Sequence, residues 1–308
     1  MDGHCDTISE VCDKKQMLYS NSFQLDLERM RKAGRYVQFF AAFIDPEHSR
    51  TFALRRALQL IDEFYRQMEV NHDYISHCCE YREVEDALKG GKVAAILSIE
   101  GGEALQGELS VLRVLYRLGV RSICLTWNYR NELADGAAEE ITGGGLTRFG
   151  REAVKEMNSL GILVDLSHIT EKGFWDVMEL TEQPVIVSHS NAKKICNHRR
   201  NLTDAQIQAV RDNKGVIGIN LYPHFLNETG TASLKDVISH IEHIAGIAGI
   251  EHIGMGADFD GIECTPEDIK GVQDIHKIFD ELAKLNYPPE FIERLAGLNF
   301  LRVIKEVL

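Results

Sequence analysis

The chain has 308 residues, of which 44% are hydrophobic and 26% are charged, as in an ordinary globular protein. Its net charge of −13 at pH 7 argues against a nucleic-acid partner, because phosphate binding needs clustered Lys and Arg side chains. No apolar stretch approaches the roughly 18 residues of a membrane-spanning helix, so we predict no membrane partner.

The seven cysteines have no framework spacing, which is typical of a reducing compartment rather than of a disulfide scaffold. The N-terminus also lacks the basic start and apolar run of a secretory signal. The sequence therefore predicts a cytoplasmic protein.

Short apolar runs alternate with helical patterns along the chain, which predicts successive βα units and a parallel sheet. Segments with strand character cover residues 1–6, 36–44, 93–100, 122–128, 163–168, 184–189, 215–221 and 252–259. The first segment is short, so we expect either a very short strand or one that begins upstream of Met1.

Helical patterns cover residues 51–70, 109–118, 147–159, 172–180, 203–213, 233–248 and 289–307. The helix expected at 203–213 opens with Thr203 and has Gln206 three residues later, which is the capping-box pattern. No repeat, low-complexity tract or linker divides the chain. We therefore predict a single catalytic domain over residues 1–308.

Eight strands can form a closed (β/α)₈ TIM barrel or an open doubly wound α/β sheet. We predict the barrel, because candidate functional residues follow both the first and the last strand, and only closure brings those strands together. No Gly-x-Gly-x-x-Gly turn follows the first strand, which argues against a dinucleotide-binding fold.

Polar side chains end several of the expected strands. His4 and Asp6 are two residues apart in an extended segment, where alternate side chains share a face. Glu100 ends a long apolar run, and a buried carboxylate there must be paired, neutralised or bound to a metal. His168 and His189 end two strands, each directly after a Ser. Taken singly, these residues also fit a capping Asp, a salt-bridged Glu or core histidines.

Together the five residues form a set of imidazole and carboxylate ligands that suits zinc. Glu100 has two oxygens and can bridge two ions. Asp258 closes the last strand and can hold a metal-bound water or pass a proton to a leaving amine; the neighbouring Asp260 is the better candidate for a turn residue. Two ions about 3.5–4 Å apart activate a hydroxide and polarise a carbonyl, which is hydrolase chemistry.

At these motifs the sequence resembles the renal (membrane) dipeptidase family of zinc peptidases, within the metal-dependent amidohydrolase barrels. The resemblance covers nearly the whole chain. The matching segments are residues 2–6, 99–102, 146–150, 164–168, 187–190, 196–201, 256–261 and 299–302.

The resemblance implies two Zn²⁺ ions per chain. His4, Asp6 and Glu100 would bind one ion, and the bridging Glu100, His168 and His189 would bind the other. A hydroxide activated by both ions would then attack the peptide carbonyl, with Asp258 as the catalytic acid and base for the departing amine.

The resemblance also implies substrate contacts. Arg200 matches the arginine that binds the substrate carboxylate, and a guanidinium fork suits that group; the adjacent Arg199 fits an ordinary surface ion pair. Mammalian members have a His that helps hold the substrate carbonyl oxygen where this chain has Trp127. The indole N–H of Trp127 or the side chain of Asn128 is the candidate for that contact.

We therefore predict a two-zinc dipeptidase whose substrates include dipeptides with a C-terminal D-residue, and the resemblance suggests a homodimer. One alternative is another hydrolase on the same scaffold, acting on β-lactams, N-acyl amino acids or phosphoesters. A second alternative is a non-catalytic zinc-binding protein. Asp258 argues against it, because a structural zinc site needs no extra carboxylate facing open coordination positions.

Overall fold

A parallel β-sheet forms the centre of the molecule. The structure is a computed structural model that describes residues 1–47 and 51–308. Its strands are β1 (Val37–Phe43), β2 (Ile75–His77), β3 (Val93–Glu100), β4 (Val120–Cys124), β5 (Leu163–Asp165), β6 (Ile186–Ser190), β7 (Val216–Ile219) and β8 (Ile253–Met255). They pair in the order β1-β3-β4-β5-β6-β7-β8, and β2 lies beside β3.

The N-terminal segment joins the two edges of this sheet. Asp2 forms parallel bridges to Gln38 of β1 and to Met255 of β8. The N–H of Asp2 donates to the carbonyl of Val37 at 2.9 Å, and the N–H of Gly3 donates to the carbonyl of Met255 at 2.8 Å. Cys5 forms a third parallel bridge, to Phe259. The strand predicted over residues 1–6 is therefore only a set of isolated bridges, yet it closes the predicted barrel.

Several strands are shorter at their carboxyl ends than the sequence predicts. β5 stops at Asp165 and β8 stops at Met255, whereas the predicted strands continue to residues 168 and 259. His168 has φ 67° and Asp258 has φ 63°, and this left-handed conformation is incompatible with a strand. The chain thus bends at the residues that the sequence singles out for chemistry.

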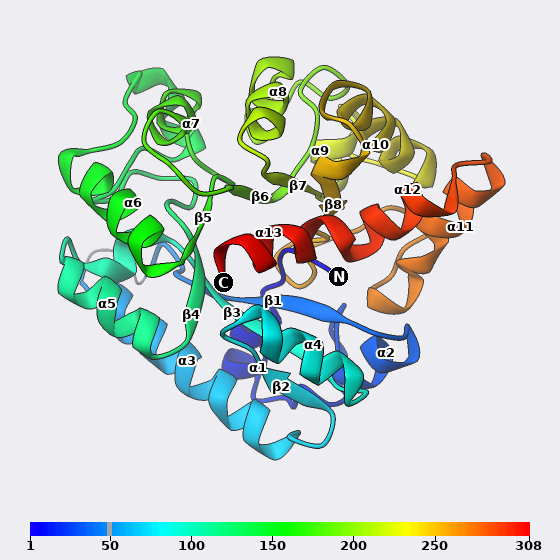
Figure 1. Cartoon of the computed structure of the whole chain (residues 1–308), viewed down its shortest axis with the longest axis horizontal. Helices are drawn as coiled ribbons and strands as arrows, with labels where there is room; N and C mark the ends of the chain where they lie inside the picture. The colour runs from blue at the N-terminus through cyan, green and yellow to red at the C-terminus, as the bar shows by residue number, and fades with distance from the viewer. Residues whose placement is uncertain (48–50) are drawn as a thin grey trace.

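Helices surround the sheet (Figure 1). They are α1 (Thr7–Lys14), α2 (Leu27–Lys32), α3 (Ala53–Val70), α4 (Tyr81–Lys89), α5 (Leu109–Arg117), α6 (Arg148–Leu160), α7 (Glu171–Met178), α8 (Asp204–Asp212), α9 (Pro223–Leu226), α10 (Leu234–Ala248), α11 (His276–Lys284), α12 (Pro289–Glu293) and α13 (Asn299–Val307). Each predicted helix has a counterpart, and the predicted capping box at Thr203 is present.

The predicted helix over residues 289–307 is interrupted. α12 is followed by a π-helical stretch, Arg294–Leu298, with a kink at Gly297, and α13 begins after it. The extra unit formed by β2 and α4, and the helices α1, α2, α9 and α11, were not predicted. Most of these elements are short, so each offers too few turns for a clear hydrophobic period.

The buried side chains form two clusters. The larger one fills the space between the sheet and the surrounding helices. The smaller one joins the first residues of several strands, including Val37 and Leu163, to Phe300 and Val303 of α13. In Figure 1, α13 accordingly crosses the amino-terminal end of the barrel. This leaves the carboxyl end for the site. No helix in residues 1–47 and 51–308 is both long and apolar enough to cross a bilayer.

Candidate active site

The five residues predicted as metal ligands lie together at the carboxyl ends of the strands. His4 comes from the N-terminal segment and Asp6 precedes α1; Glu100 is the last residue of β3. His168 follows β5 and His189 lies in β6. All five side chains are buried, although each carries an ionisable group. Ionisable side chains are almost never buried in such a group unless they are paired or bind metal.

Glu100 stands at the centre of this group. Its Oε1 lies 2.9 Å from Nε2 of His168 and 3.6 Å from Nε2 of His189. Its Oε2 lies 3.5 Å from Nε2 of His4. The two carboxylate oxygens thus face different imidazoles, which is the arrangement expected of a carboxylate that bridges two ions.

Asp6 completes the side of the group that contains His4. Its Oδ2 lies 3.3 Å from Nε2 of His4, while its Oδ1 is buried without a hydrogen-bond partner among the described residues. A buried carboxylate oxygen with no donor is costly, and a metal ion would satisfy it. Gly261 lies so close that a Cβ there would be 2.2 Å from Oδ2 of Asp6, so a larger residue would displace the carboxylate.

In His168 and His189, the ring nitrogen Nδ1, which faces away from Glu100, contacts a side-chain oxygen. Ser188 Oγ donates to the carboxylate of Asp165 and therefore accepts from Nδ1 of His189, at 2.8 Å. The side-chain oxygen of Asn128 lies 3.0 Å from Nδ1 of His168. Protons at both Nδ1 atoms leave lone pairs on both Nε2 atoms.

The arrangement of these lone pairs indicates whether the site can hold a metal ion. The Nε2 atoms of His168 and His189 are 2.9 Å apart, and both face the carboxylate of Glu100. Lone pairs and carboxylate oxygens at such distances repel one another unless a proton or a metal cation lies among them. Among residues 1–47 and 51–308, three groups have ligand atoms within 4.8 Å of one another: His4, Asp6 and Glu100; Glu100, His168 and His189; and His4, His189 and Asp258. The residues therefore fit metal ions.

The pKa values of the three histidines are shifted in different directions. Burial, with the charges of Arg200 and His4 nearby, lowers the pKa of His168 and of His189 well below the usual value, so both rings are neutral at pH 7. Burial opposes charge on His4 too, but the carboxylates of Glu100 and Asp6 outweigh burial and raise its pKa well above the usual value. Burial also raises the pKa of Glu100 to about 7.

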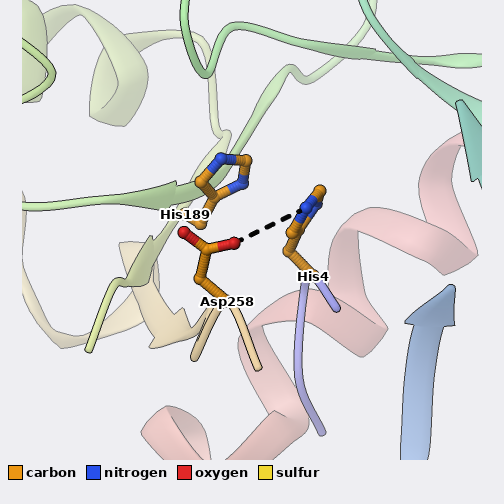
Figure 2. Close-up of side chains that lie close together, drawn as sticks. All are labelled: His4, His189 and Asp258. Atoms are coloured by element: carbon orange, nitrogen blue, oxygen red, sulfur yellow. Dashed lines mark ion pairs between the residues drawn. The ribbon is translucent and has the colours of Figure 1, made fainter. Parts of the chain in front are cut away.

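The carboxylate of Asp258 lies beside the rings of His4 and His189 (Figure 2), whose centroids are 4.0 Å apart. Its Oδ1 is 3.8 Å from Nε2 of His4, and its Oδ2 accepts from Nδ2 of Asn220 at 2.8 Å. Asn220 was not predicted to take part. It directly follows the apolar strand β7, so the same signal, a polar residue at a strand end, could have identified it.

Asp260 anchors the loop that carries Asp258. Its Oδ2 accepts from the hydroxyl of Thr7 and its Oδ1 accepts from the backbone N–H of Gln24, both at 2.6 Å. This structural position agrees with the prediction that Asp260 is the turn residue of the pair.

A cleft of about 610 Å³ opens beside this group. The metal-ligand candidates Asp6, Glu100 and His168 line it, together with Trp127, Asn128 and Asp258. The ring of Trp127 packs edge-on against Phe43, with centroids 5.5 Å apart, and forms part of the cleft wall. Trp127 therefore offers an apolar surface to this cleft.

Arg200 is not among the residues that line this cleft, but it lies beside the backbone of His189 and against Phe225, which does line it. Its side chain is buried; Nη2 donates to the carbonyl of His189 at 3.3 Å, and the guanidinium lies 5.5 Å from the ring centre of Phe225. Nε is buried without an acceptor among the described residues. Burial lowers the pKa of Arg200, because the charged guanidinium is poorly solvated there.

A known protein family matches the chain over its whole length. Residues 1–308 match the family described as membrane dipeptidase, peptidase family M19. The chain belongs to the membrane dipeptidase family. It is therefore a metallopeptidase that hydrolyses the peptide bond of dipeptides, as the sequence predicts.

Relatives and solved structures support the same membership. An uncharacterized dipeptidase of Schizosaccharomyces pombe is 38% identical over 301 residues, which are 91% of this chain and 71% of that protein. A metallopeptidase from Rhodobacter sphaeroides, liganded with a phosphinate mimic of the dipeptide L-Ala-D-Ala, superposes with a TM-score of 0.93 at 28% identity and covers 100% of this chain and 98% of its own. A dipeptidase of family M19 has a TM-score of 0.94 at 28% identity, with 99% and 97% covered.

Proposed function

We propose that this membrane dipeptidase family member uses two zinc ions, one held by His4, Asp6 and Glu100 and the other by Glu100, His168 and His189. The observation that carries the proposal is the central carboxylate of Glu100, whose two oxygens face three imidazole nitrogens at 2.9–3.6 Å. Zinc ions bound there would supply an activated water and would polarise the scissile carbonyl.

Asp258 is proposed as the group that moves the proton. Asn220 donates to its Oδ2, whereas its Oδ1 lies 3.8 Å from Nε2 of the proposed ligand His4. A carboxyl group fixed in this way can take a proton from the attacking water and deliver it to the departing amine. Its left-handed φ of 63° is strained for a residue with a side chain, which favours a functional reason for its position.

Arg200 is proposed to bind the substrate carboxylate. Its buried guanidinium has an unsatisfied Nε and lies next to the backbone of His189. A dipeptide's terminal carboxylate would supply the missing acceptor and charge. Trp127 would pack on the substrate, and its indole N–H or Asn128 would contact the carbonyl oxygen.

The proposed substrates include dipeptides with a C-terminal D-residue. The Rhodobacter sphaeroides metallopeptidase is liganded with a mimic of L-Ala-D-Ala, and its fold matches over this entire chain. The decisive measurement is amino-acid release from L-Ala-D-Ala and from L-Ala-L-Ala, with and without chelator, together with zinc content. We expect two zinc ions per chain and chelator-sensitive release from both substrates. Absence of release with two zinc ions bound would instead favour another amidohydrolase-type reaction.

The homodimer and the cytoplasmic location remain predictions. Light scattering coupled to size-exclusion chromatography would measure the mass of the assembly, and fractionation of the source cells would locate the protein.

A further inference from the structure

Asn128 contacts a proposed metal ligand directly. Its side-chain oxygen lies 3.0 Å from Nδ1 of His168, on the far side of the ring from Glu100. A carbonyl oxygen can only accept, so this hydrogen bond places the ring proton on Nδ1. The other nitrogen, Nε2, then keeps its lone pair and lies 2.9 Å from Oε1 of Glu100.

The backbone around Asn128 is held in place from two sides. Its carbonyl accepts from the N–H of Ala138 at 2.8 Å, and the N–H of Ala137 donates to the carbonyl of His168 at 2.7 Å. Gly136 forms an antiparallel bridge with Ile169, so the loop after β4 is joined to the loop after β5. These bonds fix Asn128 and His168 relative to each other.

Gly136 makes this close approach possible. A Cβ at this position would lie 2.2 Å from the carbonyl oxygen of Trp127 and 2.4 Å from the carbonyl carbon of Asn128. Both clashing atoms are backbone, so a side chain at Gly136 would have to push residues 127 and 128 away. The position of the Asn128 amide therefore depends on a glycine eight residues later.

The second histidine is supported by different chemistry. Nδ1 of His189 donates to Ser188, whose hydroxyl donates in turn to the carboxylate of Asp165. The partner of Nδ1 in His168 is instead the neutral side-chain amide of Asn128. The two rings therefore have separate supports, and each support can be removed without changing the other.

We propose that Asn128 is a positioning residue of the metal centre, which holds His168 in the tautomer and orientation needed to bind zinc. This inference rests on the proposed function, because His168 is a zinc ligand only there. It gives Asn128 a role separate from the contact with the substrate carbonyl oxygen expected from the sequence. The two roles predict different defects.

The test compares Asn128→Leu, which removes the acceptor at similar volume, with Asn128→Asp, which keeps an oxygen. Zinc affinity is measured by competition with a chromophoric chelator, and the cobalt-substituted proteins are compared by visible absorption. We expect Asn128→Leu to lower the affinity for one of the two zinc ions about 10–100-fold. KM at saturating zinc should stay within about twofold of the wild-type value. Asn128→Asp should restore most of the affinity.

Gly136→Ala leaves the Asn128 side chain unchanged but should displace it, so we expect the same loss of affinity for one zinc ion. Gln208→Leu, on an exposed position of α8, is the matched control for an amide-to-leucine change. Circular dichroism checks that each variant folds.

The outcomes separate the inference from the proposed function. Unchanged zinc affinity in a folded Asn128→Leu protein, with KM raised, would overturn the positioning role in favour of a substrate contact. A wild-type protein that binds no zinc pair and releases no amino acids would instead contradict the proposed function itself.

Discussion

At the scale of single residues, the site concentrates buried ionisable groups whose charges depend on one another. Glu100, Asp258 and His4 lie within 4 Å of a neighbouring ionisable group. Burial opposes charge on each of them, and neighbouring opposite charges and hydrogen bonds, such as that from Asn220 to Asp258, counteract it. Such a group is poorly suited to stability and well suited to binding a cation.

Zinc binding should therefore depend on pH. Burial raises the pKa of Glu100 from 4.5 to about 7 in the metal-free protein, and the pKa of His4 is also raised. A proton held by either ligand must leave before zinc binds, so affinity should fall as the pH is lowered from 8 to 5.5. Chelator competition at several pH values measures this. A constant affinity over that range would contradict the assignment of these ligands.

Asp258→Asn should separate metal binding from turnover. The amide preserves the shape of the side chain but cannot accept or deliver the proton in the same way, so turnover should fall by about 10²–10⁴-fold. Zinc content should stay at the wild-type level, because Asp258 is not among the proposed ligands. Metal analysis beside steady-state kinetics tests both statements. Turnover close to wild type would remove Asp258 from the mechanism.

At the scale of elements, opposite ends of the barrel have different tasks. α13 closes the amino-terminal end, where Phe300 lies 6.1 Å from Phe39 between ring centres. A Cβ at Gly3 would lie 2.7 Å from the Phe300 ring, and one at Gly254 would lie 2.5 Å from it. Glycines in the N-terminal segment and in β8 thus make room for this ring. The side chains proposed for chemistry lie at the other end.

Phe300→Ala should consequently reduce stability rather than chemistry. Loss of a fully buried phenylalanine costs about 3–5 kcal/mol, because the transfer free energy is lost and a cavity remains. Denaturant unfolding of the metal-loaded protein measures the cost, and kcat per folded molecule should stay near wild type. Glu306→Ala, at an exposed position of α13, is the control. A large fall in kcat with unchanged stability would show that the two ends are coupled.

At the scale of the whole molecule, the negative charge extends into the cleft. The acidic residues that line it are Asp6, Glu10, Asp13, Asp45, Glu47, Glu100, Asp258, Asp260 and Glu263. Arg56 also lines the cleft, but it binds Asp13 through two hydrogen bonds at 2.6–2.7 Å. The net charge of the chain, −13, has the same sign, so an anionic substrate approaches against the field of the protein.

Dipeptides with a cationic N-terminal residue should therefore be better substrates than anionic ones. We expect kcat/KM for Lys-D-Ala to exceed that for Glu-D-Ala by about tenfold or more at low salt. The difference should shrink at high salt, because screening acts within about 3 Å at 1 M ionic strength. Kinetics at two salt concentrations test this, with L-Ala-D-Ala as the neutral control. A preference for the anionic dipeptide would refute the effect of the field.

The barrel and the candidate ligands could be predicted because they leave periodic signals. Glu100, His168 and His189 each follow or end an apolar run, and parallel strands bring their carboxyl ends to one edge. The contacts of the supporting residues leave no such signal. Asn220 follows an apolar strand, but its partner Asp258 is 38 residues away, and Asn128 is 40 residues from His168, so nothing local indicates either contact.

The sequence by itself determined the fold class, the family and the residues that converge, because hydrophobic periodicity and motif identity are local properties of the chain. The tertiary structure alone decided how the barrel closes: the segment around Asp2 hydrogen-bonds on both sides without forming a regular strand. It also decided that the side chain of Asn128 contacts His168 and that Arg200 is buried beside the backbone of His189. Those contacts join loops that are far apart in sequence. The left-handed bends of the backbone at His168 and Asp258 help to set the distances between these loops.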